Sequence, residues 1–333
     1  MTVTEKFRAF RIHEADKGVR AGFETLVLDD LTPGDVVIRV EYSSINYKDA
    51  LAATGAGRIL RRFPLNGGID AAGTVVESAD SRYKSGDPVL ITGCGLGETV
   101  DGGFCEYVRA EGDWVIPIPE GLDARQAMML GTAGFTAALA IHKMEHNGQS
   151  PDKGAIVVTG ATGGVGSIAI DMLSGRGYDV AAVTGKIDEV GYLTSLGATE
   201  VRDRTKVDLG KRPMEKAEFA GAIDNLGGET LTWLTRTVGW WGNIASIGLA
   251  SSIKLDTTVM PFILRGISLL GINSMATPRD LRLAVWNRIA SDLKPRHLEQ
   301  IASREIAFDD LPGEFDGYLS ARVRGRTVVR IRS

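Results

Sequence analysis

The residues with the clearest chemical meaning form a glycine-rich segment, GATGGVGS at 160–167, directly after the apolar run AIVVT at 155–159. Gly160 permits a tight turn, and Gly163 lets backbone N–H groups come close to a pyrophosphate. Gly166 lets a helix pack closely on a strand. The first N–H groups of that helix attract anions. A flexible turn would contain similar glycines, but the flanking strand and helix patterns favour a dinucleotide site. We expect this site to contain Thr162, Gly163, Gly164, Val165, Gly166 and Ser167.

The next predicted strand, 179–184, indicates which dinucleotide is bound. An NAD site usually carries Asp or Glu about 20 residues after the glycines, where it bonds the ribose 2′-OH. Here the strand ends in Thr184 and, after a glycine, Lys186; a hydroxyl and a cation suit a 2′-phosphate. Asp188 lies two residues further on and fits equally well the N-cap of the following helix. We therefore expect NADPH, with Arg202 and Arg204 as further phosphate partners.

Patterns typical of other reaction centres are missing from the sequence. A catalytic zinc needs clustered Cys, His or Glu ligands, and the two cysteines lack the C-x-x-C spacing of a zinc or redox site. There is no Tyr-x-x-x-Lys pair after the glycines and no G-x-S-x-G nucleophile motif. We expect hydride chemistry without a metal, reduced thiols, and ordinary structural roles for the scattered residues His13, His142, His146, His297, Cys94 and Cys105.

Length and charge limit the other possibilities. A chain of 333 residues exceeds the roughly 250–300 residues at which a single core stops growing, so two domains are expected. A formal charge of −4 gives little general attraction to nucleic acid or anionic membranes. The N-terminus is charged where a signal peptide is apolar, and the uncharged run 126–142 is too short for a membrane span. We expect a cytoplasmic protein without a nucleic-acid or membrane partner.

The pattern of elements changes near residue 123. Before it, strand-like runs at 35–42, 73–77, 89–92 and 114–118 alternate with turns, which predicts an antiparallel, partly barrel-like domain. After it come a helix at 123–144 and then alternating strands and helices, with strands at 155–159, 179–184, 219–224, 243–247 and 266–272 and a helix at 188–196. This alternation is typical of a doubly wound parallel sheet. The last strands, near 304–308 and 327–331, are expected to return to the first domain.

Several segments together resemble a known family. SSINYKD at 43–49, GTAGFTA at 131–137, the glycine loop and TVMPFILRGISLLGINS at 258–274 resemble the zinc-free, quinone-oxidoreductase-like side of the medium-chain dehydrogenase/reductase superfamily. NYKD at 46–49 and MPFILR at 260–265 resemble its NADPH-dependent acryloyl-CoA reductase branch. The resemblance implies a GroES-like, mostly-β catalytic domain at 1–127 and 276–333, a Rossmann NADPH-binding domain at 128–275, and a homodimer. It also implies NADPH contacts at Tyr47, Leu249, Ile263 and Ser274.

The same resemblance implies a reaction, the reduction of the C=C bond of a short 2-enoyl-CoA, acrylyl-CoA to propionyl-CoA, by NADPH. Hydride addition to the β-carbon places negative charge on the thioester oxygen, so the site needs hydrogen-bond donors. Asn46 and Tyr47 are the catalytic candidates, although Tyr47 could instead stack on the cofactor. One departure concerns the cofactor: relatives often have a basic residue directly after the Leu-Gly-Ala turn, where this chain has Thr199 and Glu200 before Arg202.

A CoA ester also carries phosphates, for which Arg58, Arg61, Arg62 and Arg324 are candidate partners, with Arg322 and Arg326 nearby. A solvated basic turn is the alternative for each. The apolar strand at 266–272 is a candidate edge strand that pairs with its twin in the dimer, or else an internal strand. Two other functions remain open at this point: an NADPH-dependent quinone or enone reductase that acts on free small molecules, and a non-catalytic NADPH-sensing protein.

Overall fold

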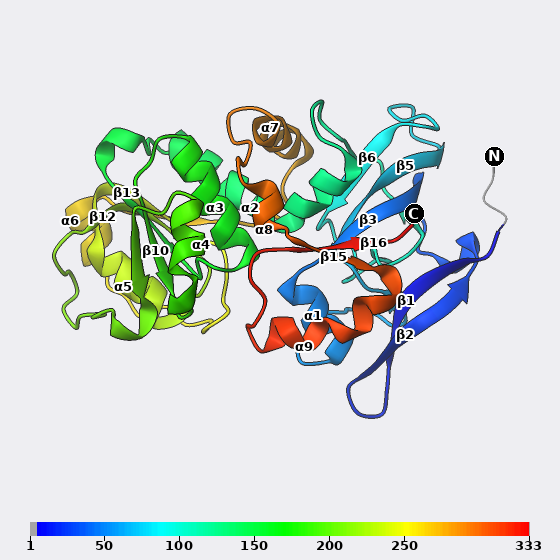
Figure 1. Ribbon diagram of the computed structural model, residues 1–333, viewed down its shortest axis with the longest axis horizontal. Coiled ribbons are helices and arrows are strands. Elements are labelled where there is room, and N and C mark those ends of the chain that lie inside the picture. Colours follow the sequence, from blue (N-terminus) through cyan, green and yellow to red (C-terminus); the bar gives the residue numbers. More distant parts are fainter. Residues whose placement is uncertain (1–4, 333) are drawn as a thin grey trace. The chain divides into compact units, whose positions relative to one another are not determined.

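The N-terminal part of the chain forms mainly antiparallel sheets, which C-terminal strands join, in the computed structural model, which describes residues 5–332 (Figure 1). One sheet has three strands in the order β2-β1-β4, and the other has seven, in the order β15-β16-β3-β5-β6-β8 with β7 paired to β3. The expected return of the C-terminal strands is confirmed, because β16 pairs with β3. The bounds are β1 Phe7–Glu14, β2 Val19–Leu26, β3 Val36–Ile45, β4 Leu65–Asn66, β5 Asp70–Ser78, β6 Pro88–Thr92, β7 Tyr107–Ala110, β8 Ile116–Pro117, β15 Arg304–Ala307 and β16 Thr327–Arg330.

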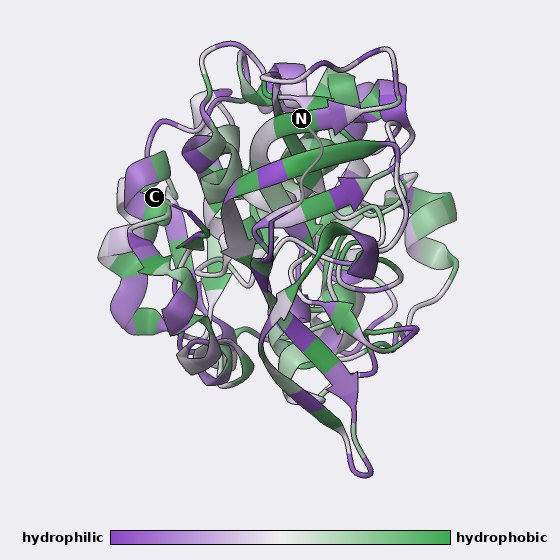
Figure 2. Ribbon diagram, turned by 90° about the vertical axis from the view of Figure 1, so that its right-hand side faces the viewer, coloured by the Kyte–Doolittle hydropathy of each residue, from purple (hydrophilic) through white to green (hydrophobic). Residues whose placement is uncertain are grey.

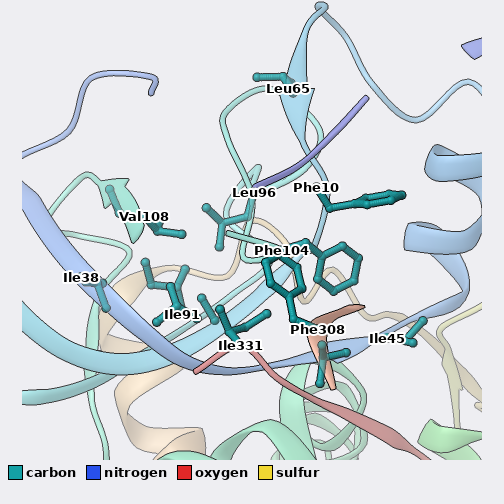
Figure 3. Packing of buried hydrophobic residues seen from close by; sticks show 14 of the residues in the cluster. Phe10, Ile38, Ile45, Leu65, Ile91, Leu96, Phe104, Val108, Phe308 and Ile331 are labelled. Atoms are coloured by element: carbon teal, nitrogen blue, oxygen red, sulfur yellow. The ribbon is translucent and has the colours of Figure 1, made fainter. Parts of the chain in front are cut away.

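The strands β3, β5 and β6 of this unit are buried along most of their length. Figure 2 shows hydrophilic and hydrophobic bands along single strands. The inward side chains form one core that contains residues distant in sequence, for example Phe10, Ile38 and Phe308 (Figure 3). The β1–β2 hairpin did not feature among the strands predicted from the sequence. Its eight register pairs extend the sheet that carries β4.

The second part of the chain forms a six-stranded parallel sheet in the order β11-β10-β9-β12-β13-β14. This is the doubly wound arrangement predicted from the alternation of elements. The predicted helix at 188–196 is split into η3, a 3-10 turn that contains Asp188, and α4, so Asp188 is not an N-cap. The bounds are β9 Ile156–Thr159, α3 Gly164–Gly175, β10 Val180–Thr184, η3 Ile187–Glu189, α4 Val190–Ser195, β11 Glu200–Asp203, β12 Phe219–Asp224, α5 Gly228–Thr237, β13 Val238–Ser246, α6 Met260–Arg265 and β14 Ser268–Gly271.

The remaining elements are helical. The predicted helix at 123–144 is present but broken at Gly131, where φ is +52°. Among the described residues, no helix has both the length and the apolar character that crossing a membrane requires. The bounds are η1 Leu28–Asp30, α1 Tyr47–Thr54, α2 Ala124–His146, η2 Pro151–Lys153, η4 Arg204–Lys206, α7 Arg279–Ile289, α8 Leu298–Ile301, η5 Phe308–Gly313 and α9 Phe315–Leu319.

The chain divides into two compact units with discontinuous membership. The first contains the residues up to Thr132, Met275–Trp286 and the residues from Ala302 onward, and the second contains Ala133–Ser274 and Asn287–Ile301. Residues 287–301 thus join the parallel-sheet unit, whereas the sequence analysis assigned them to the first domain. The physical reason is a polar contact: the backbone N–H of His297 donates to the buried Asp171 of α3 at 2.9 Å.

Candidate active site

The glycine loop lies between β9 and α3, at the carboxyl edge of the parallel sheet. Gly160 adopts a φ of +59°, which suits only glycine at low cost. A Cβ on Gly166 would stand 2.5 Å from the carbonyl oxygen of Gly160, so the helix approaches the strand as closely as the sequence predicts. Gly163 is the N-cap of α3, and the N–H groups of the first helical turn have no partner within the helix. This geometry provides donors for a phosphate.

Two further residues of the same edge fit a bound dinucleotide. Asp224, at the end of β12, accepts from the Thr159 hydroxyl at 2.6 Å and from the Gly227 N–H at 2.8 Å, and burial raises its pKa. Asn225 donates to the carbonyl of Thr159 at 2.8 Å, but its Oδ1 atom is buried without a partner in the part of the chain described. Such an acceptor beside the loop is satisfied when a ligand with hydrogen-bond donors occupies the edge. Sequence reasoning missed both residues, since neither belongs to the glycine pattern.

The end of β10 carries the residues expected to choose between NADPH and NADH. Thr184 is buried and its hydroxyl accepts from the Lys186 N–H at 3.0 Å. Arg202 already has two carboxylate partners, since it donates to Glu200 and Glu218 at 2.7 Å each. Arg204 is exposed, and its guanidinium lies 3.5 Å from the position of a Cβ on Gly185. Two cations therefore lie beside the end of β10: Lys186, which the sequence predicted, and Arg204.

The other cofactor candidates lie at two different edges of the sheet. Leu249 follows β13 and Ser274 follows β14, so both lie beyond the carboxyl ends of their strands, as the glycine loop does. Ile263 belongs to α6, which precedes β14 and therefore leads into the amino end of that strand. The structure brings Leu249 and Ser274 to the edge of the glycine loop and leaves Ile263 at the opposite edge of the same chain.

In the first unit, Asn46 and Tyr47 stand at the start of α1. Asn46 is the N-cap, and Asp49 completes a capping box by accepting from the Asn46 N–H at 2.8 Å. Tyr47 is 46% exposed, so a ligand can contact this residue. Lys48 donates to Glu98 at 2.6 Å. Asp49 therefore caps the helix, and the partner of Lys48 is Glu98.

The side chain of Asn46 is held in a buried polar network. Its amide donates to Asp70 at 2.8 Å, and its oxygen accepts from Arg326 at 3.0 Å. Asp70 also accepts from the Ser44 hydroxyl at 2.7 Å and from the Thr132 N–H at 3.0 Å. Because its donors and acceptor are already used, Asn46 is placed to orient the start of α1.

The break in α2 has its cause in this network. A Cβ on Gly131 would lie 2.5 Å from the Arg326 guanidinium and 2.6 Å from the Asp70 carboxylate. The opened turn lets the Thr132 N–H reach Asp70. Arg326 is 3% exposed and also donates to the carbonyl of Ile45. It is consequently a structural residue, which corrects the suggestion that it contributes to CoA binding.

Two carboxylates, those of Asp49 and Asp70, thus lie close together beside the Asn46 amide. The Asn46 amide bridges them, at 3.3 Å from Asp49 and 2.8 Å from Asp70. Burial, and secondarily the charge of Asp70, raise the pKa of Asp49 to about 7. Asp49 is only 2% exposed and touches no open surface. Its ionisation therefore affects α1 and the Asp70 network first.

The arginines proposed for the CoA phosphates have open side chains. Arg58, Arg61 and Arg62 follow α1 in the first unit and are all exposed. Across residues 5–332 their guanidinium groups make no ion pair or hydrogen bond. Arg324 is also exposed and belongs to the same unit. Arg58, Arg61 and Arg62 thus remain available to an anionic ligand.

The residues considered for a metal are scattered. Over the described part of the chain, no group of three His, Cys, Asp or Glu side chains is arranged to hold a metal ion. Both cysteines are free, and burial raises the pKa of Cys105 to about 12. Burial lowers the pKa of His142. One unit thus has a sheet edge that fits a dinucleotide. The other unit has an exposed tyrosine, Tyr47, followed in the sequence by the exposed arginines Arg58, Arg61 and Arg62.

Comparison with known proteins identifies the family. Residues 32–120 match the alcohol dehydrogenase GroES-like domain, and residues 164–291 match the family described as zinc-binding dehydrogenase. The chain is 46% identical over 326 residues to the putative quinone oxidoreductase YhfP of Bacillus subtilis, covering 98% of this chain and 99% of the relative. The chain belongs to the medium-chain dehydrogenase/reductase superfamily, on its quinone-oxidoreductase-like side. This confirms the fold class and the family expected from the sequence.

Within this superfamily, the chain is also similar to acrylyl-CoA reductases. It is 45% identical over 315 residues to the acrylyl-CoA reductase AcuI of Ruegeria pomeroyi, covering 94% of this chain and 95% of the relative. Among solved structures, the yhdH oxidoreductase of Salmonella enterica in complex with NADP superposes with a TM-score of 0.95 at 44% identity, over 98% of this chain and 100% of that one. The Bacillus subtilis protein yhfP, with NAD bound, gives a TM-score of 0.96 at 46% identity, over the same shares.

Proposed function

We propose that this protein reduces the C=C bond of a short 2-enoyl-CoA with NADPH, most specifically acrylyl-CoA to propionyl-CoA. The observation that carries the proposal is the set of open arginines that follows the exposed Tyr47 within one unit, since a CoA ester brings phosphates and a free quinone does not. Relatives named acrylyl-CoA reductase and a similar structure solved with NADP support the same reading. The glycine loop and the unpartnered Asn225 oxygen fit the cofactor.

NADPH, when bound, supplies the hydride that adds to the β-carbon of the alkene. The π electrons of the C=C bond then move toward the thioester oxygen, and a proton must reach the α-carbon to give the saturated thioester. We propose that the exposed Tyr47 hydroxyl donates a hydrogen bond where this negative charge develops. Asn46 acts as a positioning residue, because its side chain is held by Asp70 and Arg326.

The substitution Tyr47→Phe tests this role while keeping the ring. A hydrogen bond to developing charge predicts a kcat reduced by roughly 10²–10³-fold, with NADPH affinity within about twofold because stacking is retained. If NADPH affinity falls and kcat is unchanged, Tyr47 is a cofactor contact only, and the proton and charge roles belong to other residues.

The CoA anchor is tested with the double charge reversal Arg61→Glu with Arg62→Glu. Both side chains are exposed and have no ion-pair or hydrogen-bond partner in the described part of the chain, so the fold should not change. We expect the KM for acrylyl-CoA to rise at least tenfold, since two attractive charges become repulsive. The matched control reverses Lys84, another exposed cation of the same unit, and should leave the KM unchanged. Equal effects of the two changes would contradict a local anchor.

A quinone or enone reductase is the second candidate, because the 46% identical YhfP is described as a putative quinone oxidoreductase. The deciding experiment follows NADPH oxidation with acrylyl-CoA, with a simple quinone, and with NADH in place of NADPH. Fast turnover of acrylyl-CoA supports the main proposal. Quinone turnover with acrylyl-CoA inert refutes the thioester assignment, and NADPH binding without turnover of either substrate favours a sensor.

We also propose that the active form is a homodimer. The strand β14 lies at the edge of the parallel sheet in the described structure, and its outer backbone groups have no neighbouring strand. Leu269 and Leu270 on it are only half-buried. An apolar edge of this kind is normally covered, and pairing with the same strand of a second copy covers it. Analytical ultracentrifugation of the purified protein tests this proposal.

A further inference from the structure

The parallel-sheet unit contains a polar cavity of about 100 Å³ that does not involve the glycine loop. Three segments of the unit form its wall: the loop before β12, the end of α5 and the loop before α6. A water molecule occupies ~30 Å³ of the liquid, so the cavity is large enough for a tetrahedral oxyanion. The residues on its wall are Lys211, Pro213, Arg236, Asp256, Thr257 and Thr258.

This cavity lies at the amino edge of the parallel sheet. Arg236 belongs to the last turn of α5, and the chain enters β13 two residues later, at Val238. The loop that contains Lys211 leads into the amino end of β12, and α5 packs against both strands (Figure 1). The glycine loop lies at the opposite, carboxyl edge, and the six residues of β12 span ~20 Å at ~3.3 Å per residue. A phosphate bound at the glycine loop is therefore far from this cavity.

Three side chains on the wall have hydrogen-bond donors that no group in residues 5–332 accepts. Arg236 uses only its Nη1 atom, which donates to two backbone carbonyl oxygens at 2.8 and 3.2 Å. The Lys211 ammonium group has neither an ion pair nor a hydrogen bond. Thr258 accepts from the Met260 N–H at 3.3 Å, which leaves its own hydroxyl proton to donate. The cavity thus presents two cations and a hydroxyl to a ligand.

An acid of the same loop, Glu215, does not cancel these charges. Its carboxylate accepts from the backbone N–H groups of Lys211 at 3.0 Å and Arg212 at 2.9 Å. The Arg212 guanidinium also donates to it at 2.8 Å, and this hydrogen bond lowers the pKa of Glu215 to about 2. Because Glu215 is paired with Arg212, the ammonium group of Lys211 remains available to a ligand.

The wall of the cavity also carries a carboxylate. The backbone N–H of Asp256 donates to the Thr232 hydroxyl at 3.1 Å. Within the part of the chain that the structure describes, the Asp256 carboxylate forms no hydrogen bond and no ion pair with Lys211 or Arg236. An ionised carboxylate only accepts hydrogen bonds. A ligand that fills this cavity must therefore carry a hydrogen-bond donor as well as the negative charge that the two cations attract.

We propose that this cavity binds inorganic phosphate. Hydrogen phosphate has oxygen atoms that accept from Lys211, Arg236 and Thr258, and it keeps an O–H group that donates to Asp256. A phosphate ester has a second pKa of about 6, so at pH 7 it has largely lost that proton, and sulfate has none. Either would place an oxygen lone pair against the carboxylate. Asp256 thus selects free phosphate among tetrahedral anions.

The site is separate from the proposed active site, and the inference does not depend on the reductase proposal. Equilibrium dialysis of the full chain against radiolabelled inorganic phosphate measures affinity and stoichiometry, with and without saturating NADPH. The variant Lys211→Glu reverses one cation of the cavity. The matched control, Lys216→Glu, makes the same change at a lysine of the same loop that does not line the cavity. Both side chains are exposed, so both variants should fold.

We expect one phosphate per chain, whether NADPH is present or absent. Lys211→Glu should weaken phosphate binding at least tenfold, because an attractive charge becomes repulsive. Lys216→Glu should change the affinity by less than about threefold, because salt screens exposed charges that do not touch the ligand. Equal losses in the two variants, or phosphate binding that NADPH abolishes, would overturn the inference. A chain that binds phosphate as expected but reduces no enoyl-CoA refutes the reductase proposal alone.

Competition with sulfate and with adenosine monophosphate tests the identity of the ligand. Unlabelled phosphate should displace the label at a concentration at least tenfold lower than either competitor requires, since both lack the proton that Asp256 accepts. In Asp256→Asn the side-chain amide can donate, so the preference for phosphate over sulfate should disappear. Better displacement by adenosine monophosphate than by phosphate would identify a nucleotide site and overturn the inference. A preference over sulfate that Asp256→Asn leaves unchanged would overturn it too.

Discussion

Selectivity for NADPH is predicted to depend on Arg204 rather than on Arg202. The Arg204 guanidinium lies beside Gly185 at the end of β10, which is where the adenosine ribose sits in doubly wound folds. Arg202, two residues earlier, is bound by Glu200 and Glu218 and lies over the Phe219 ring at 4.9 Å. The substitution Arg204→Gln should therefore weaken NADPH binding and leave NADH binding unchanged.

The magnitude follows from the exposure of the contact. A hydrogen bond to a charged group contributes about 1.5–3 kcal/mol, and each ~1.4 kcal/mol is tenfold in affinity. Arg204 is exposed, so salt screens the interaction, and the lower end of this range applies near physiological ionic strength. We expect a roughly tenfold weaker NADPH affinity at ~0.15 M salt and a larger loss at low salt. The NADH affinity should change by less than about twofold.

The assay titrates both dinucleotides by fluorescence at two salt concentrations, with Arg202→Gln as the matched control. Both variants lose one positive charge within three residues, but Arg202 has carboxylate partners, whereas Arg204 has none among residues 5–332. The ratio of NADPH to NADH affinity should fall in Arg204→Gln and change little in Arg202→Gln. A larger fall in Arg202→Gln, or an equal loss of NADH affinity in Arg204→Gln, would refute the reasoning.

Three further predictions concern stability and the glycine loop. Arg326→Met leaves a buried carboxylate without its cation and should lower the free energy of unfolding by about 3 kcal/mol in urea denaturation; an unchanged midpoint would count against the network. The pKa of Asp49 in the folded state is about 7, whereas an Asp in an unfolded chain has a pKa of ~3.9. Because the folded state binds the proton more tightly, the free energy of unfolding of the wild type should fall as the pH rises from 4 to 7. In Asp49→Asn this fall should be smaller, and an identical pH profile would contradict the assignment. Gly166→Ala should lower the free energy of unfolding by about 1–3 kcal/mol and abolish NADPH binding, because its Cβ has no space. The control Gly163→Ala should fold normally. Equal thermal stability of the two variants would contradict the prediction.

The sequence determined the features that depend on local periodicity and on glycine. Strands such as Phe219–Asp224 were predicted with the bounds that the structure shows, because an apolar run between turn residues has few other conformations. The glycine loop was predicted because Gly160 and Gly166 occupy positions where a Cβ is strained or excluded. The β1–β2 hairpin was missed because its residues mix charges with apolar positions and show no strong strand signal of their own.

Only the tertiary structure decided which of several similar residues are engaged. Arg202 and Arg204 have the same chemistry in the sequence, and Glu218, sixteen positions away from Arg202, is one of the partners that distinguish them. Arg326 was one of several C-terminal cations until it was found buried against Ile45, 281 positions away. Long-range pairing of this kind leaves no local pattern, because a buried charge is recognised only by the partners that fold around it. The edge of the sheet at which Ile263 lies likewise depends on strand order and on the path of the chain, which the residue types around it do not encode.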